Sequence, residues 1–289
     1  ETGSRASRIA GALAFLLLIA GCSMPFWAEP ARLRGLAEFF YVLALAQMWN
    51  LLAGYGGMVS IGQQAFVGIG GYTLVVLGLN AGLNPFLAVP TGGLVAGLLA
   101  LPAGCLLFRL RGAYFAIGTW VVAEVYRLIF AQFKLLGGGT GTSLPPGVTN
   151  GVAGIEWVKA LFDVRTPAAR DIVTYWIALA LVAFTVFAVY WILRSRRGLA
   201  LAAIRDSEAA AESVGVDNFR TKFWVYVFAA FGTGMVGALI YLQKARVSPD
   251  AAFSVLDWTA YVVFIVVIGG IGTIEGPIVG VIVFYLMQT

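Results

Sequence analysis

Long apolar runs alternate with short polar segments along the chain. A helix needs about 20 predominantly apolar residues to cross the hydrocarbon core of a bilayer. The pattern therefore predicts an all-α, polytopic membrane protein with about eight or nine transmembrane helices, organised as one domain over residues 1–289. The runs 86–108 and 172–193 contain no charged residue. The other candidate spans are 9–28, 37–53, 58–79, 113–133, 223–243, 257–272 and 275–288.

Glycine interrupts this pattern within 54–71 and within 269–276. A helix broken inside a membrane leaves backbone N–H and C=O groups unpaired, which is tolerated only where they line a cavity or lie buried in protein. The two tracts are therefore candidate elements of a translocation path. Glycine in a transmembrane helix more commonly permits close packing against a neighbouring helix, and that interpretation stays open for each glycine.

Polar residues in and near the tracts are the candidate path residues. Broken helix ends can meet a carboxylate and an ammonium group without fixed charges. Each side chain taken alone, however, is more often an interhelical hydrogen-bond partner than a contact for a transported solute. The candidates are Asn50, Ser60, Gln63, Gln64 and Thr119, together with Gly269 and Gly270.

Composition narrows the class of protein. The chain is 11% charged, against roughly 25% in soluble domains, so most of its surface is expected to face lipid. Its net charge of +5 comes without the basic and aromatic pattern of a nucleic-acid-binding protein. Histidine is absent, which excludes histidine metal sites, Ser-His-Asp triads and histidine proton relays. With no paired catalytic carboxylates and no ATP-binding motif either, we expect no enzyme activity, metal or cofactor on this chain.

Basic residues in short loops predict the orientation in the membrane. Arg109 and Arg111 lie in a tight loop, and three arginines follow the uncharged span 172–193 directly. Both segments are expected to be cytoplasmic. Residues 134–171 then form an external loop and residues 194–222 a cytoplasmic one.

The cytoplasmic loop 194–222, which we call the coupling segment, is rich in Ala with Arg and Glu, a composition of high helix propensity. Residues 199–215 are predicted to form one short helix, which Gly215 would end. Small Ala side chains would let a soluble partner approach closely, while Arg205, Asp206 and Glu208 would make charged contacts at the rim. A solvated surface helix without a partner is the competing interpretation.

Five separate segments carry a more specific signal. They read WNLLAGYGGMVSIGQQAFVGIGGYT at 49–73, RLRGAYFAIGTW at 109–120, GLALAAIRDSEAAAESVGV at 198–216, VSPD at 247–250 and GGIGTIEGP at 269–277. In this order they resemble the signature of the permeases of branched-chain amino-acid ABC importers, and they cover nearly the whole chain. Within that family the chain is similar to the permease with the longer external loop.

The resemblance implies an importer of the bacterial inner membrane with two membrane subunits, two ATP-binding cassette subunits and a periplasmic solute-binding protein. This chain would be one multi-pass permease, paired with a second related permease, and only the partner subunits would use ATP. The implied cargo is leucine, isoleucine or valine. The residues implied in ATPase coupling are Gly198, Ala203, Arg205, Asp206, Glu208, Ala209, Ala210 and Gly215.

The chain departs from the family pattern at two places. Gln63 stands where the family often has a histidine, and four residues rather than three separate Glu208-Ala209-Ala210 from Gly215. Related permeases also carry urea and short amides, so these stay alternative cargoes. A secondary transporter without an ATPase is a further alternative, although it would be expected to carry a more prominent buried ion or proton relay.

Glu124 and Arg127 lie inside the run 113–133, spaced to share one helix face. Charges within the membrane are costly and usually face the protein interior or water. We expect a structural pair or a pair at a subunit interface, rather than a direct part in transport.

Overall fold

The computed structural model describes residues 11, 16–80, 84–149, 151–152 and 154–288. Within this part, six helices are long and apolar enough to cross a membrane, and three shorter apolar helices accompany them. The prediction of an all-α polytopic membrane protein is confirmed. The six are Ala31–Tyr55, Phe86–Leu107, Ala113–Gln132, Thr166–Arg194, Asn218–Lys244 and Pro249–Gly269, and the shorter three are Leu16–Phe26, Gln63–Leu79 and Gly276–Gln288.

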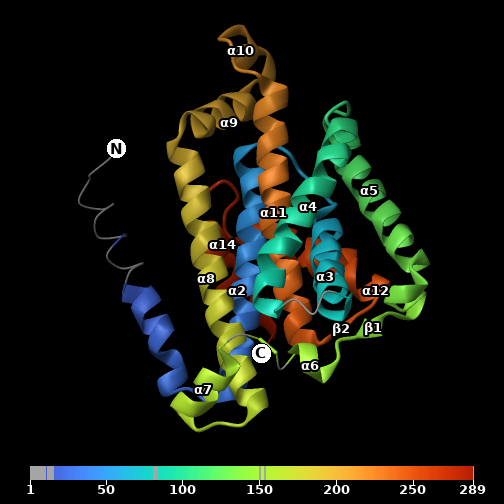
Figure 1. The fold of residues 1–289 in the computed structure, drawn as a ribbon. Helices are drawn as coiled ribbons and strands as arrows, with labels where there is room; N and C mark the ends of the chain where they lie inside the picture. Colours follow the sequence, from blue (N-terminus) through green and yellow to red (C-terminus); the bar gives the residue numbers. More distant parts are fainter. Residues whose placement is uncertain (1–10, 12–15, 81–83, 150, 153, 289) are drawn as a thin grey trace.

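Long helices form the body of the protein, and short elements join them at its two ends (Figure 1). The helices of the body are α2 (Pro30–Asn50), α3 (Gln63–Asn80), α4 (Pro85–Leu107), α5 (Ala113–Gln132), α8 (Thr166–Arg194), α11 (Asn218–Lys244), α13 (Tyr261–Gly269) and α14 (Gly276–Gln288). The short elements include α6 (Pro146–Thr149), α7 (Ile155–Phe162), α9 (Arg196–Asp206), α10 (Glu208–Ser213), α12 (Pro249–Ala252), β1 (Thr142–Ser143) and β2 (Arg246–Val247). Two π-helical segments, Leu51–Tyr55 and Leu256–Ala260, continue α2 and precede α13.

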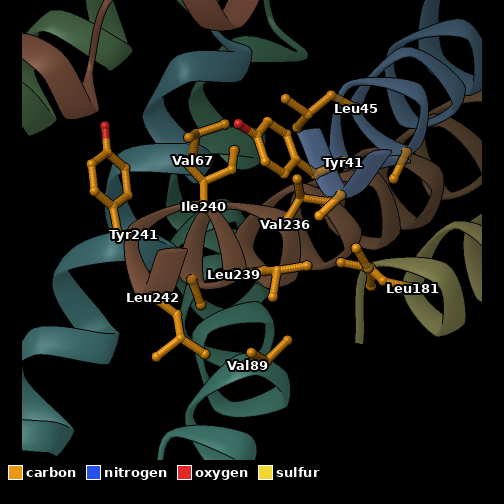
Figure 2. Close-up of a cluster of buried hydrophobic side chains, with 14 of the residues drawn as sticks. Tyr41, Leu45, Val67, Val89, Leu181, Val236, Leu239, Ile240, Tyr241 and Leu242 are labelled. Atoms are coloured by element: carbon orange, nitrogen blue, oxygen red, sulfur yellow. The ribbon is translucent and has the colours of Figure 1, made fainter. Parts of the chain in front are cut away.

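Helix α11 is the centre of the bundle. In the apolar stretch of 18 residues within this helix, 78% of the residues are buried inside the protein. The helix packs against α2, α3, α4 and α8. Val236, Leu239 and Ile240 of α11 lie in a buried cluster of apolar side chains (Figure 2). Tyr41 of α2 and Val67 of α3 belong to the same cluster. Because lipid tails are as apolar as these side chains, close packing rather than exclusion from water holds the helices together.

The run 58–79 is only partly helical. Helix α3 begins at Gln63, and residues 56–62 are irregular. From Gln63 onward the helix continues through its glycines without a break. A Cβ atom at Gly70 would clash with the backbone carbonyl of Gly234 on α11, so this glycine permits close packing. Within the tract 54–71 the break is therefore confined to the residues before Gln63, and at Gly70 the alternative of close packing applies.

Helix α5 lies at one side of the bundle (Figure 1). In the apolar stretch of 18 residues within α5, only 17% of the residues are buried by this chain. It contacts α3, α4 and α12, and much of its remaining surface is free for lipid or another chain.

The two predicted loops lie at opposite ends of the bundle (Figure 1). One end carries α6, α7 and the β1–β2 pair, and the other carries α9 and α10. The loop expected over 134–171 is shorter than predicted, because α8 begins at Thr166. It is also more regular, since Thr142 and Ser143 pair antiparallel with β2. Which end faces the cytoplasm stays a prediction, as does the single permease domain.

Candidate translocation path and coupling site

The first glycine tract breaks the chain between α2 and α3. Helix α2 widens into the π-helical segment Leu51–Tyr55, and residues 57–62 then have irregular backbone. The indole N–H of Trp49 donates to the carbonyl of Ser60 (2.8 Å), and the Ser60 hydroxyl accepts from the amide of Gly62 (3.2 Å). Buried side chains thus satisfy part of the irregular backbone, as a break inside a membrane requires.

The second tract separates α13 from α14 and lies against the first. Gly270 and Gly272 have φ of +115° and +80°, values that favour glycine. The Asn50 side chain donates to the carbonyl of Thr273 (2.7 Å) and accepts from the amide of Gly272 (2.8 Å). Gln47 donates to the carbonyl of Ile274 (2.8 Å). Two segments more than 200 residues apart therefore form one structure, which we call the glycine joint (residues 51–62 with 269–276).

Three other candidate path residues are buried beside the joint and bond to neighbouring segments. Gln63 donates to the carbonyl of Leu45 (2.9 Å). The Thr119 hydroxyl accepts from the amide of Ile61 (3.0 Å). Gln64 accepts a hydrogen bond from the hydroxyl of Thr259. Gln63 and Gln64 show the interhelical bonding that is most common for such residues, whereas Thr119 bonds to the joint itself. The part of all three in transport stays a prediction.

The remaining two path candidates shape the turn after α13. A Cβ atom at Gly269 would clash with the carbonyl of Gly276, so the chain approaches itself closely there. The carbonyl of Gly270 accepts from the hydroxyl of Thr273 (3.0 Å), which in turn accepts from the amide of Gly276 (2.9 Å). These hydrogen bonds fix the conformation of the turn to which the Asn50 side chain bonds.

The coupling segment contains two helices rather than the one predicted over 199–215. Helix α9 ends at Asp206, and Ser207 has an extended backbone before α10 begins. The Ser207 hydroxyl accepts from the amide of Ala210 (3.3 Å), as an N-cap serine does. The cap satisfies a free N–H group of α10, which explains why the Ala-rich sequence does not continue as one helix.

Helix α10 ends as the sequence predicts. The carbonyl of Ala211 accepts from the amide of Val216 (3.0 Å), and that of Glu212 accepts from the amide of Gly215 (3.0 Å). With Gly215 at φ +85°, this is the hydrogen-bond pattern of a Schellman motif.

The predicted coupling residues divide into an exposed and a buried group. Gly198 is buried where α9 leaves α8, and a Cβ there would clash with the carbonyl of Leu193. Ala203 is partly buried. Glu208 pairs with Lys222 of α11, which ties α10 to that helix. The exposed residues of the group are Arg205, Asp206, Glu208, Ala209, Ala210 and Gly215.

Arg205 is exposed and also contacts the glycine joint, and its charged contact at the rim stays a prediction. Its Nη1 donates to the carbonyl of Gly54 in the glycine joint (3.1 Å). Its Nε lies 3.6 Å from Asp206 on the outer side. The side chain is 45% exposed and so contacts the joint and the solvent at once.

A cavity of about 770 Å³ opens between the joint and α10. Residues 57–59 of the joint line it together with the α4–α5 loop and α10, including Arg111, Glu208 and Lys222. The cavity therefore connects the coupling segment to the irregular backbone. Among the described residues, no group of three His, Cys, Asp or Glu side chains could hold a metal ion.

Glu124 and Arg127 pair as predicted, and a third residue joins them. Arg127 contacts Glu124 (2.6 Å) and Asp250 of α12 (2.8 Å). We call these three residues the charge cluster. Asp250 was not expected to join this pair, although it ends the VSPD motif at 247–250. The sequence pattern also did not point to Thr259, which bonds to Gln64, or to Thr273, which bonds to Gly276. Their only signal in the sequence is that they are polar residues in or beside apolar runs.

Comparison with known proteins identifies the family. A family model described as the permease component of branched-chain amino acid transport systems matches residues 31–289. The high-affinity branched-chain amino acid transport system permease protein LivM of Salmonella typhimurium is 30% identical over 270 residues, which is 89% of this chain and 63% of that protein. LivM of Escherichia coli K12 is 30% identical over 272 residues with the same coverage.

A probable branched-chain amino acid transport permease protein LivM of Methanocaldococcus jannaschii is 24% identical, over 79% of this chain and 58% of that protein. The chain spans less than two thirds of the length of these curated relatives. No solved structure matches. Because the family model covers the chain from α2 to residue 289, this membrane protein belongs to the permease component family of branched-chain amino acid transport systems.

Proposed function

We propose that this chain is the transmembrane permease subunit of an ATP-driven ABC importer for branched-chain, hydrophobic amino acids in the bacterial inner membrane. The observation that carries the proposal is that α9 contacts the glycine joint directly through Arg205. An ATPase that moves α9 would therefore act on the irregular backbone proposed to line the path. The sequence contains no G-x-x-x-x-G-K-[ST] motif, so ATP hydrolysis belongs to separate ATP-binding cassette subunits.

The exposed side of α9 and α10 is the proposed docking surface for those ATPases. Asp206, Ala209 and Ala210 are exposed there. Two alanines let a partner seat closely, and charges around them set the register more than the affinity. The break at Ser207 gives the surface an angle, so a groove on the ATPase would have to receive a bent pair of helices.

The character of the proposed path supports an amino-acid cargo. The path candidates are neutral amides, hydroxyls and glycine backbone, which can meet a carboxylate and an ammonium group without fixed charges. The absence of charged residues among these candidates suits an apolar side chain such as that of leucine, isoleucine or valine. The names of the relatives, which specify branched-chain amino acid transport, point to the same cargo.

The charge cluster supports a second permease as a partner. Arg127 and Glu124 lie in a helix that this chain leaves largely uncovered, with 28% and 45% of their side chains exposed. Charges within a membrane usually face protein or water rather than lipid. We therefore place the second permease against the outer face of α5. A periplasmic solute-binding protein would dock at the opposite end from α9, on the segment with α6, α7 and the β1–β2 pair.

The whole proposal is tested on the complex purified from native membranes. An affinity tag on this chain should bring down an ATP-binding cassette protein and a second permease. Reconstituted into vesicles with the cognate binding protein, the complex should take up leucine only when ATP is supplied on the α9 side. Uptake of urea or acetamide in place of leucine would establish the alternative cargo. Leucine uptake driven by an ion gradient without ATP would identify a secondary transporter.

The permease interface has its own test. We expect Arg127→Ala to leave Glu124 and Asp250 as uncompensated acids and to reduce recovery of the second permease, with the ATPase still bound through α9. Lys159→Ala is the matched control, because it removes a basic residue from the Glu156 ion pair on α7, away from α5. Equal recovery of the second permease with both variants would contradict this interface.

The orientation is tested by thiol labelling. After Cys22 and Cys105 are replaced, single cysteines at Ser143 and Ala209 report on the two ends. An impermeant reagent added to spheroplasts should label position 143 and spare position 209. The reverse result would invert the proposed topology.

A further inference from the structure

Helix α9 is seated on the end of α2 by its buried face. Leu201 and Ile204 of α9 are buried. A methyl group at Gly56 would lie 3.6 Å from Leu201, in ordinary contact, so the helix rests on the backbone just beyond the π-helical segment. This seating brings the next exposed turn of α9, and Arg205 with it, to the glycine joint.

The Arg205 side chain lies against three glycines of the joint. The stem of Arg205 passes over Gly57, where an added Cβ would lie 3.6 Å from its Cγ. Its Nη1 donates to the carbonyl of Gly54 (3.1 Å) and lies 3.4 Å from the place a Cβ would take on Gly272. The guanidinium therefore contacts one glycine tract by a hydrogen bond and approaches the other.

The two tracts are in direct contact at the same point. A Cβ on Gly54 would lie 2.5 Å from the amide nitrogen of Gly272, which is too close for any side chain. Asn50 holds the second tract through two hydrogen bonds, one turn before Gly54. A displacement of Gly54 should therefore also move the turn between α13 and α14, because the two backbones are in contact.

The charge of Arg205 fits its acceptor. The carbonyl of Gly54 lies in the last turn of a long helix, where the backbone carbonyls lack helical partners and the helix dipole is negative. A guanidinium donating to such a carbonyl forms a charge-assisted hydrogen bond, which is stronger than a neutral one. When α9 moves, this bond should therefore keep Gly54 attached to Arg205, whereas two apolar side chains in contact could slide past each other.

We propose that Arg205 is the positioning residue through which movement of α9 reaches the translocation path. It acts by its hydrogen bond to Gly54 rather than by holding the ATPase. This inference rests on the proposed function, and it assigns separate roles within the coupling segment. The exposed alanines and Asp206 dock the ATPase, while Arg205, Leu201 and Ile204 connect the docked helix to the joint.

The experiment compares Arg205→Ala and Arg205→Lys with the control Arg109→Ala in the reconstituted complex. Arg109 is an exposed arginine of the α4–α5 loop, outside the coupling segment. Three quantities are measured for each: recovery of the ATPase, ATP hydrolysis, and leucine taken up per ATP hydrolysed. Amide hydrogen exchange of residues 51–57 and 270–275 is followed with and without a non-hydrolysable ATP analogue.

We expect Arg205→Ala to retain the ATPase and its hydrolysis while leucine uptake per ATP falls by about tenfold. The nucleotide-dependent change in exchange at 51–57 and 270–275 should disappear as well. Arg205→Lys, which keeps the charge but has a compact ammonium group, should lose less. The control should match the wild type in every measurement.

Two results would overturn the inference. Loss of ATPase binding in Arg205→Ala would make the residue a docking contact, and uptake per ATP at the wild-type level would leave it without a role. If the wild-type chain recovered no ATPase at all, the proposed function itself would be refuted, and this result is distinct from the two above.

Discussion

Helix α3 and the glycine joint are both rich in glycine, yet the backbone behaves differently in them. In α3 the helix is regular, and Gly70 serves to bring the backbone of α11 close. In the joint, Gly270 and Gly272 take positive φ values and end the helix. The two regions differ in the groups that surround their glycines. Gly70 faces a neighbouring helix backbone, whereas the joint is held by side-chain bonds from Asn50 and Gln47. One substitution, glycine to alanine, can therefore separate the roles.

The largest effect is expected for Gly70→Ala. The added methyl group would overlap the carbonyl of Gly234, and neither backbone can move without separating α3 from α11. Overpacking of this kind costs about 3 kcal/mol. The midpoint of thermal unfolding in detergent should fall clearly, and uptake should fall with it. A midpoint equal to that of the wild type would show that α3 and α11 are not tightly packed here.

Gly272→Ala should separate stability from transport. The left-handed backbone costs about 1–2 kcal/mol for a residue with a Cβ, and the methyl group would lie 3.1 Å from the carbonyl of Gly54. We expect a smaller fall in the unfolding midpoint than for Gly70→Ala but a large loss of leucine uptake. If uptake fell only in proportion to stability, the joint would be a packing element like α3.

Gly215→Ala tests a glycine with positive φ outside the membrane helices. The site is open, with no atom within 4 Å of an added Cβ, so the effect comes from the backbone alone. The strain of the left-handed backbone, about 1–2 kcal/mol, should loosen the end of α10. Faster hydrogen exchange at 211–216 should appear with little change in the global midpoint. Unchanged exchange would mean that another conformation of the turn is equally stable.

Gly35→Ala should have the smallest effect and the opposite sign. Gly35 lies inside α2, with ordinary helical backbone and no atom within 4 Å of an added Cβ. Alanine is favoured over glycine in a helix by about 0.8–1 kcal/mol in water. The unfolding midpoint should rise slightly and leucine uptake should stay as in the wild type. A fall in either would reveal a contact on this face that this chain alone does not make.

Hydrophobic runs predicted the long helices well, because the requirement to cross a bilayer acts on each segment separately. The run 172–193 lies within α8, and the run 86–108 nearly coincides with α4. The C-terminal stop at Gly215 was predicted for the same reason, since its signal is local.

The sequence did not reveal contacts between distant segments. Arg205 was expected at the rim of α9, and only the fold brings the carbonyl of Gly54 within its reach. Asp250 joins Arg127 across 123 positions, which no helical spacing indicates. The break at Ser207 was missed for another reason, because helix propensity and capping compete there and the outcome depends on the local geometry.

The pairing of β1 with β2 has a consequence for the end of the bundle opposite α9. Thr142 lies across from Val247, and the amide of Leu144 donates to the carbonyl of Ala245 (2.8 Å), so the connection after α5 is fastened to the end of α11. Ordering a free loop on association costs conformational entropy and lowers affinity. A surface fixed in advance avoids that cost, so a macromolecule that binds there can do so as a nearly rigid body.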